Sequence, residues 1–262
     1  MRLSLQLCPQ NSDAAVPINY QYPLSAAIYK ILAQASPDYA SFLHDQGYAS
    51  PSGRVMKLFT FSKLWITTGK MQGTVLKSIR RSPWRVQIAS PMQEEFVQNF
   101  VLGLFETAEL VLAGQGVRAK FRVEQVEALP SPDFKEKQRF KCLSPIVAST
   151  SHERDGRKHI YYYRPHDAGL SEALLKNLRQ KHEIIHGKQP EFVPLTFRLE
   201  PQDKPKSKLI TIKEGTSEAT HVSCFETYFT LQGSVELMQT AWECGLGEHN
   251  SHGFGMVEVV NL

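Results

Sequence analysis

The order in which strand-like and helical patterns follow one another along the chain constrains its fold most. Residues 1–9 alternate apolar and polar side chains, which is typical of a half-buried strand. From Pro23, apolar residues recur every three or four positions, which is typical of a helix packed on a core. The expected elements of the first half are a strand at 1–9, a helix at about 23–35, strands at 54–65 and 75–89, a helix from about 91 with Phe96, Phe100, Leu102, Leu104 and Phe105 in the core, and a strand at about 117–126.

The second half repeats this order after residues 128–136, where two prolines and mixed charges predict a linker. We expect strands at 139–148 and 159–163, a helix at 169–185, strands at 192–199, 209–213 and 222–231, a helix at 234–244 capped by Ser234, and a strand at 256–260. Strand, helix, strand, strand, helix, strand is the order of the ferredoxin-like unit. We therefore predict an α+β protein of two tandem ferredoxin-like (RRM-like) domains, residues 1–127 and 137–262, with antiparallel sheets, helices on one face and one extra hairpin in the second domain.

Composition excludes a membrane-spanning protein. Hydrophobic residues make up 42% and charged residues 21% of the 262 residues, as in an ordinary globular protein. No apolar run approaches the roughly 20 residues that span a bilayer. The start of the chain turns polar too soon for a signal peptide. The four cysteines lie far apart without a C-x-x-C pair, so we expect no disulfide framework and a cytoplasmic location.

The strongest local signal is a set of four glycines, at 245, 247, 253 and 255, between the last expected helix and strand. Glycine permits positive φ and lets backbone N–H groups approach a ligand, and such groups suit phosphate oxygens. No Gly-Lys-Ser/Thr follows, and the helix precedes the loop, which argues against a nucleotide-binding P-loop or Rossmann turn. On spacing alone, a phosphate-binding loop and a tight helix-to-strand turn both stay open.

The stretch GLGEHNSHGFGMVE at 245–258 resembles the C-terminal signature of the RAMP superfamily, in particular the CRISPR endoribonucleases that cut precursor CRISPR RNA within its repeats. The resemblance extends to MRLSLQLCP at the start, AAIYKIL around Tyr29, SFLHDQGY around His44 and KLFTFSKL from Lys57. It implies two ferredoxin-like domains with the glycine-rich loop against the RNA backbone. Precursor CRISPR RNA is the implied partner, with other subunits of a CRISPR interference complex as further candidates.

The resemblance implies Tyr29, His44 and Lys57 as the catalytic residues of a metal-independent cleavage that needs no cofactor. The ribose 2′-OH attacks the adjacent phosphate, leaving a 2′,3′-cyclic phosphate and a 5′-OH. Histidine can serve as general acid or base, and lysine can stabilise the charged phosphorane. Tyrosine can position the 2′-OH or share the proton transfer. Each residue also has a structural alternative: core packing for Tyr29, a helix cap for His44 and a solvent-facing strand position for Lys57.

Basic residues predict where RNA is held. Alternation places Lys137, Arg139 and Lys141 on one face of a strand, with Phe140 and Cys142 turned inward. Further basic clusters occur at 77–85 and 204–213, and the net charge of +4 is compatible with a polyanionic partner. The expected RNA-binding residues are Lys137, Arg139, Lys141, Gly245, Gly247, Asn250, Ser251, Gly253 and Gly255.

Two alternatives stay open. The first is a non-catalytic protein of the same fold that binds CRISPR repeat RNA without cutting it. The second is a zinc metalloprotease, because His182, Glu183 and His186 spell H-E-x-x-H on an expected helix. Against the second, Gly187 ends that helix at once and no extended metalloprotease pattern follows. The sequence is compatible with a monomer or a homodimer.

Overall fold

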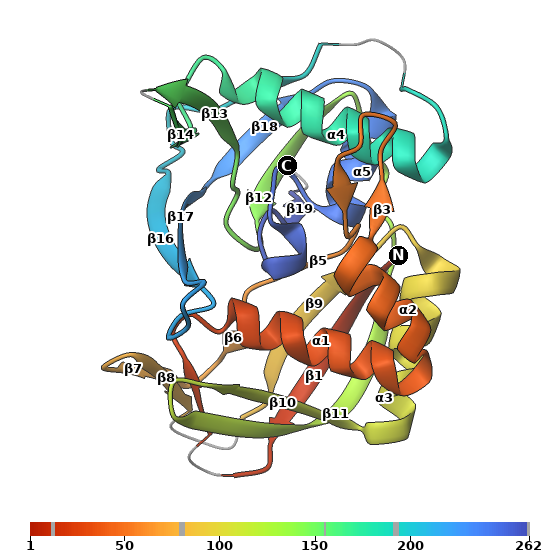
Figure 1. The fold of residues 1–262 in the computed structure, drawn as a ribbon, viewed down its shortest axis with the longest axis vertical. Coiled ribbons are helices and arrows are strands. Elements are labelled where there is room, and N and C mark those ends of the chain that lie inside the picture. The colour runs from red at the N-terminus through yellow and green to blue at the C-terminus, as the bar shows by residue number, and fades with distance from the viewer. Residues whose placement is uncertain (12–13, 79–81, 155, 191–193, 261–262) are drawn as a thin grey trace.

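The computed structural model describes the chain except residues 12–13, 79–81, 155, 191–193 and 261–262 (Figure 1). The N-terminal half contains a sheet in the order β10-β11-β1-β9-β5, all antiparallel, with β6 also paired to β9. Without the edge strand β10, this is the fourth-first-third-second order of the ferredoxin-like unit. The strands are β1 (Arg2–Pro9), β5 (Thr60–Phe61), β6 (Trp65–Ile66), β9 (Trp84–Ala89), β10 (Glu109–Gly114) and β11 (Val117–Leu129).

Helices α1 (Gln21–Ala35) and α3 (Asn99–Thr107) cover one face of this sheet. They cross closely at Gly103, where a Cβ atom would lie 2.0 Å from the carbonyl oxygen of Ile31. Phe96, Phe100 and Leu104 are buried as expected. The expectation was wrong for Leu102 and Phe105, which are 55% and 82% exposed because they lie on the outer face of α3.

Shorter elements complete the N-terminal half. Ser36 caps α2, where its hydroxyl accepts a hydrogen bond from the amide of Tyr39. The run at 54–65 is broken into short strands, and Leu58, which lies between two of them, has a φ of 50°. These elements are β2 (Ala15–Pro17), α2 (Pro37–Ser41), a π-turn (Phe42–Gln46), β3 (Tyr48–Ala49), β4 (Val55–Met56), β7 (Gly69–Gln72), β8 (Val75–Ser78) and a second π-turn (Gln93–Gln98).

The C-terminal half builds its sheet in the order β15-β18-β12-β19, which is the same fourth-first-third-second order. The predicted repeat of the same order of elements in both halves is therefore confirmed, as is the α+β class with antiparallel sheets. Helices α4 and α5 pack on one face of the sheet and share its core. The elements are β12 (Lys137–Cys142), α4 (Leu170–His186), β15 (Thr196–Arg198), β18 (Tyr228–Gln232), α5 (Val235–Cys244) and β19 (Val257–Val259).

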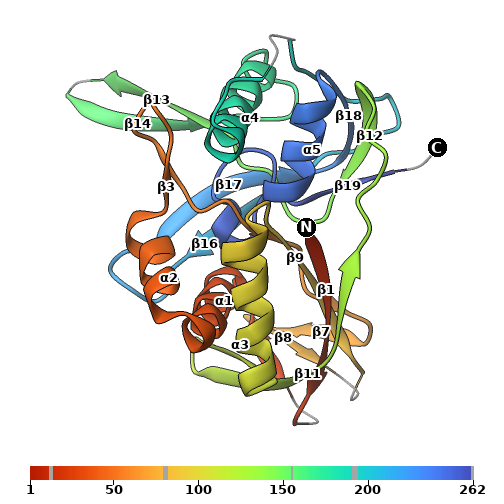
Figure 2. The ribbon, with the colours of Figure 1, turned by 90° about the vertical axis from the view of Figure 1, so that its right-hand side faces the viewer.

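Two hairpins interrupt this second unit, where the sequence predicted only one. One is β13 (Ser149–Arg154) with β14 (Arg157–Tyr162), which extends away from the rest of the C-terminal half in Figure 2. The other is β16 (Lys206–Ile212) with β17 (Thr220–Glu226). The run at 222–231 is therefore two strands, separated at Thr227. Residues 192 and 193 of the strand expected at 192–199 lie outside the described residues.

One arginine joins the two halves. Arg2 on β1 is fully buried and donates hydrogen bonds to the carbonyl oxygens of Trp242 and Val257 and to the carboxylate of Glu258. Its guanidinium group also lies 4.0 Å from the ring centroid of Trp242. The first strand thus contacts the last helix and the last strand directly. Within the described residues, no helix is long and apolar enough to cross a membrane.

Candidate active site

Tyr29, His44 and Lys57 come together from three elements. Tyr29 lies on α1, His44 in the π-turn after α2, and Lys57 between β4 and β5. The rings of Tyr29 and His44 meet edge to face with centroids 5.3 Å apart. The Lys57 ammonium donates a hydrogen bond of 2.8 Å to the carbonyl oxygen of His44. The sequence predicted these residues as a set, and the structure places them in one cluster.

The surroundings of these side chains determine their chemistry. Burial raises the pKa of Tyr29, so its phenol keeps its proton at every physiological pH. Burial lowers the pKa of Lys57, and the charge of Asp45 partly offsets this. The His44 side chain is 70% exposed. Its Nδ1 lies 2.7 Å from Oδ1 of Asp45, which orients the ring, and Nε2 has no hydrogen-bond partner among the described residues.

The glycine-rich loop lies next to this cluster. Its four glycines all have positive φ. At Gly247 a Cβ atom would lie 2.1 Å from the carbonyl oxygen of Val147, and at Gly255 it would lie 2.0 Å from that of Leu246, so no other residue fits. The four glycines are Gly245, Gly247, Gly253 and Gly255.

The loop is docked on the N-terminal half. The hydroxyl of Ser25 on α1 donates to the carbonyl oxygen of Ser251 (2.7 Å), and Thr60 on β5 donates to that of Phe254 (3.0 Å). Asn250 donates to the carbonyl oxygen of Phe254 within the loop. The side chain of Asn250 therefore stabilises the loop, which sits where the two halves meet.

Lys181 is a residue of this site that the sequence did not single out. It projects from α4, and its buried ammonium group donates to the carbonyl oxygens of Gly245 (2.7 Å) and Gly247 (2.8 Å) and to Oδ1 of Asn250 (2.7 Å). Burial lowers its pKa to about 8. Its spacing could have indicated that it is buried, because Lys181 lies on the same face of α4 as the buried Leu174 and Leu178.

A cavity of about 190 Å³ separates the loop from the strand segment that carries Lys57. Lys57, Lys181 and His252 all line it. Glu248 closes one side, because its carboxylate accepts hydrogen bonds from Arg54 and Ser149. Because Arg54 pairs with Glu248, the positive charges of Lys57 and Lys181 stay in excess in the cavity wall, an arrangement that suits an anionic group.

The basic strand lies elsewhere. Phe140 is buried and Lys137 is exposed, as the alternation predicted. Arg139, however, is held by the carboxylate of Asp203, which accepts from both of its terminal nitrogens. Lys141 lines a separate cleft of about 560 Å³ between the two halves. The structure therefore does not bring Lys137, Arg139 and Lys141 together with the glycine-rich loop.

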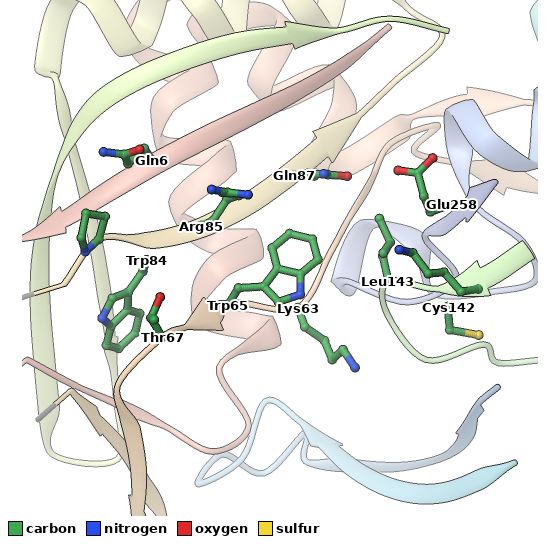
Figure 3. A pocket seen from close by; sticks show the side chains of 12 residues that line it. Gln6, Lys63, Trp65, Thr67, Trp84, Arg85, Gln87, Cys142, Leu143 and Glu258 are labelled. Carbon is green, nitrogen blue, oxygen red and sulfur yellow. The ribbon is translucent and has the colours of Figure 1, made fainter. Parts of the chain in front are cut away.

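This second cleft lies on the face of the N-terminal sheet that α1 and α3 leave open (Figure 3). Figure 3 shows Gln6 of β1 and Arg85 and Gln87 of β9 on one side, with Glu258 of the C-terminal half across the cleft. Trp65 and Lys63 lie between them, although Lys63 is paired with Glu226 at 2.8 Å. Arg80 and Arg81 of the neighbouring basic cluster lie outside the described residues.

The histidines of the H-E-x-x-H helix α4 make contacts within the protein. His182 is buried, and its Nδ1 lies 3.1 Å from the carbonyl oxygen of Lys188, beyond the helix end. Its ring centroid is 4.3 Å from that of His186. Across the part of the chain that the structure describes, no three His, Cys, Asp or Glu side chains form a group that could hold a metal ion.

Comparisons with known proteins agree with this arrangement. The family descriptions "CRISPR-associated protein Cas6, N-terminal" and "CRISPR associated protein Cas6, C-terminal" match residues 15–127 and 129–259. The chain is 32% identical to "CRISPR-associated endoribonuclease Cas6 1" of Methanocaldococcus jannaschii, over 98% of this chain and 92% of that protein. It is 28% identical to "CRISPR-associated endoribonuclease Cas6" of Pyrococcus furiosus, over 99% and 90%.

A solved structure described as "CRISPR associated protein Cas6" superposes with a TM-score of 0.76 at 30% identity, covering 100% of this chain and 99% of that one. Both halves, their order and the shared architecture are thus accounted for by one family. The chain belongs to the Cas6 family of CRISPR-associated proteins.

Proposed function

We propose that this protein is a metal-independent endoribonuclease that binds CRISPR repeat RNA and cleaves precursor CRISPR RNA by attack of the 2′-OH. The observation that carries the proposal is the cluster of Tyr29, His44 and Lys57 beside the glycine-rich loop. Two relatives described as CRISPR-associated endoribonucleases support it. The products are guide RNAs for antiviral defence.

The reaction is a transesterification within the RNA. The 2′-oxygen forms a bond to phosphorus while the bond to the 5′-oxygen breaks, and one proton leaves the 2′-OH as another reaches the 5′-oxygen. The ends are a 2′,3′-cyclic phosphate and a 5′-OH. A nucleophile that is part of the substrate needs no activated water, and therefore no metal ion.

The three side chains have distinct roles. His44 moves the proton as general acid or base, because Asp45 holds Nδ1 and leaves Nε2 open to solvent. Lys57 places a positive charge where the phosphorane develops negative charge. Tyr29 orients the 2′-OH by hydrogen bonding. It is not the base, because the burial that raises its pKa keeps the phenol protonated.

RNA is held on both sides of the cut. The amides of Gly245, Gly253 and Gly255 donate to carbonyl oxygens within the protein. The backbone N–H groups of residues 249–251, at the tip of the glycine-rich loop, therefore contact the phosphates near the cleaved bond. Lys141 of the C-terminal half and Arg85 of the N-terminal half both line the cleft of Figure 3 and extend the RNA path into it, where the indole of Trp65 offers a stacking surface. Arg139 stabilises β12 instead of binding RNA, because Asp203 already neutralises its charge.

The test is cleavage of a repeat RNA in EDTA, with mass analysis of the product ends. We expect unchanged cleavage, a cyclic phosphate on one product and a 5′-OH on the other. A single 2′-deoxy substitution at the cut should abolish cleavage without abolishing binding. Loss of cleavage in EDTA would contradict the mechanism. Repeat RNA that is bound and never cut would favour the binding-only alternative.

A further inference from the structure

His252 occupies a position in the glycine-rich loop that the cleavage chemistry above does not use. It ends the short helical turn Asn250–His252, and its ring lies nearly parallel to that of Tyr22, with centroids 6.4 Å apart and planes 14° apart. It lines the same cavity as Lys57. Tyr22 and Tyr29 are seven residues apart on α1, which places them two turns apart on one face of the helix. His252 therefore lies along the same helix face as the catalytic cluster.

The turn between β16 and β17 completes this corner of the site. Glu214 in that turn accepts a hydrogen bond of 2.7 Å from the side chain of Asn19, just before α1. Lys213 precedes it and forms an ion pair with Glu218. The first turn of α1 contains no acidic residue, and its free N–H groups add positive potential. Three segments far apart in sequence thus converge around Tyr22 and His252.

Four basic side chains, two histidines and two lysines, act on His252 from different segments. The pKa of His252 is lowered to about 4, mainly by burial, with smaller contributions from His249 in the loop, Lys213 in the β16–β17 turn, His44 in the π-turn and Lys57. Among the residues that the structure describes, no carboxylate raises the pKa of this imidazole. Burial does not attract a phosphate group, but the positive charges of Lys57 and Lys213, which also oppose a proton on His252, do.

We infer that His252, together with the ring of Tyr22, forms a subsite for the RNA nucleotide that flanks the cleaved bond, with the phosphate of that nucleotide against His252. This rests on the proposed RNA substrate and extends it by one specific contact. A phosphate at His252 adds a negative charge to the site, which favours the protonated imidazole. RNA binding therefore takes up a proton at His252, and binding tightens as the pH falls toward 5.

The experiment is calorimetric titration with repeat RNA carrying a 2′-deoxy substitution at the cut, at pH 6 in two buffers of different ionisation enthalpy. The difference between buffers gives the number of protons taken up. We expect uptake by the wild-type protein. In His252→Asn we expect less proton uptake and about tenfold weaker RNA binding. The slope of log affinity against log salt concentration should fall by about one, the value for one phosphate contact. His166→Asn, at an exposed histidine far along the chain, should match the wild type.

A second pair of variants keeps the test independent of any folding defect in the loop. Tyr22→Phe keeps the ring, and Tyr22→Ala removes it, so Tyr22→Ala should bind the RNA more weakly than Tyr22→Phe. Equal proton uptake and equal affinity in the wild type and His252→Asn would overturn the subsite. The binding readout does not require cleavage, so a protein that never cuts RNA but loses proton uptake in His252→Asn would refute the proposed nuclease and retain the subsite.

Discussion

Replacing Lys181 by methionine tests whether a buried charge holds the glycine-rich loop in place. Lys181 is 3% exposed, and its three hydrogen bonds all go to neutral oxygen acceptors of the loop. Methionine has a similar length and no donor. The substitution therefore removes the ammonium group while largely filling the space it occupied.

Two opposing contributions set the change in the free energy of unfolding of Lys181→Met. Burial lowers the pKa of Lys181 from 10.5 to about 8, so the buried charge costs about 3 kcal/mol at about 1.4 kcal/mol per pKa unit. Methionine removes that cost but leaves three oxygens unpaired, at about 2 kcal/mol each. We expect the free energy of unfolding to fall by about 3 kcal/mol at pH 7.

The pH dependence has a definite sign. The pKa of Lys181 is about 8 in the folded protein and 10.5 in the reference state, so the unfolded chain binds more protons between these values. The free energy of unfolding of the wild type therefore rises with pH across this window, relative to Lys181→Met. The cost of the buried charge is fully present below pH 8 and is relieved above it.

Urea denaturation of both proteins from pH 7 to 10 measures this difference. Lys176→Met, at an exposed lysine of the same helix, is the control and should change the free energy of unfolding by less than about 0.5 kcal/mol. If Lys181→Met is as stable as the wild type at pH 7, or if the difference between them does not grow with pH, the buried charge does not hold the loop.

Other substitutions test the rest of the structure. Arg2→Met should lower the free energy of unfolding by about 3 kcal/mol or more, because it leaves buried carbonyl oxygens unpaired between the two halves. Urea denaturation measures this change, and a decrease under about 1 kcal/mol would show that Arg2 does not join the two halves. Lys141→Ala combined with Arg85→Ala should reduce the salt dependence of RNA binding by about two phosphate contacts, measured by filter binding at several salt concentrations. Arg139→Ala should lower stability more than RNA affinity, because it leaves Asp203 without its partner; an affinity loss without a stability loss would contradict this.

Local periodicity predicted most of the fold. The alternation in residues 1–9 and the hydroxyl of Ser234, which accepts from the amide of Leu237, both appear as expected. The edge strand β10 was missed because it follows α3 directly, with only Ala108 in a left-handed conformation between them. Exposure of Leu102 and Phe105 could not be read from their hydrophobic character, because it depends on which face of α3 meets α1.

The site was predictable only where a local motif carried it. Tyr29, His44 and Lys57 were found by resemblance, but their contacts depend on the packing of three separate elements. Lys181 was missed because a single charged residue on an apolar stripe gives no indication of a partner 64 positions away. Arg139 looked available for RNA, since its partner Asp203 lies in a distant loop that alternation along one strand does not reveal.

The single-turnover rate of repeat-RNA cleavage by wild type and His44→Ala, in EDTA, tests the central claim most directly. In the proposed mechanism His44 moves the proton, and loss of a general acid or base costs about 10²–10⁴-fold in rate. We predict a decrease of that size in His44→Ala, with RNA affinity nearly unchanged because His44 is exposed at the cluster rather than part of the glycine-rich loop. A rate in His44→Ala equal to that of the wild type would contradict the account.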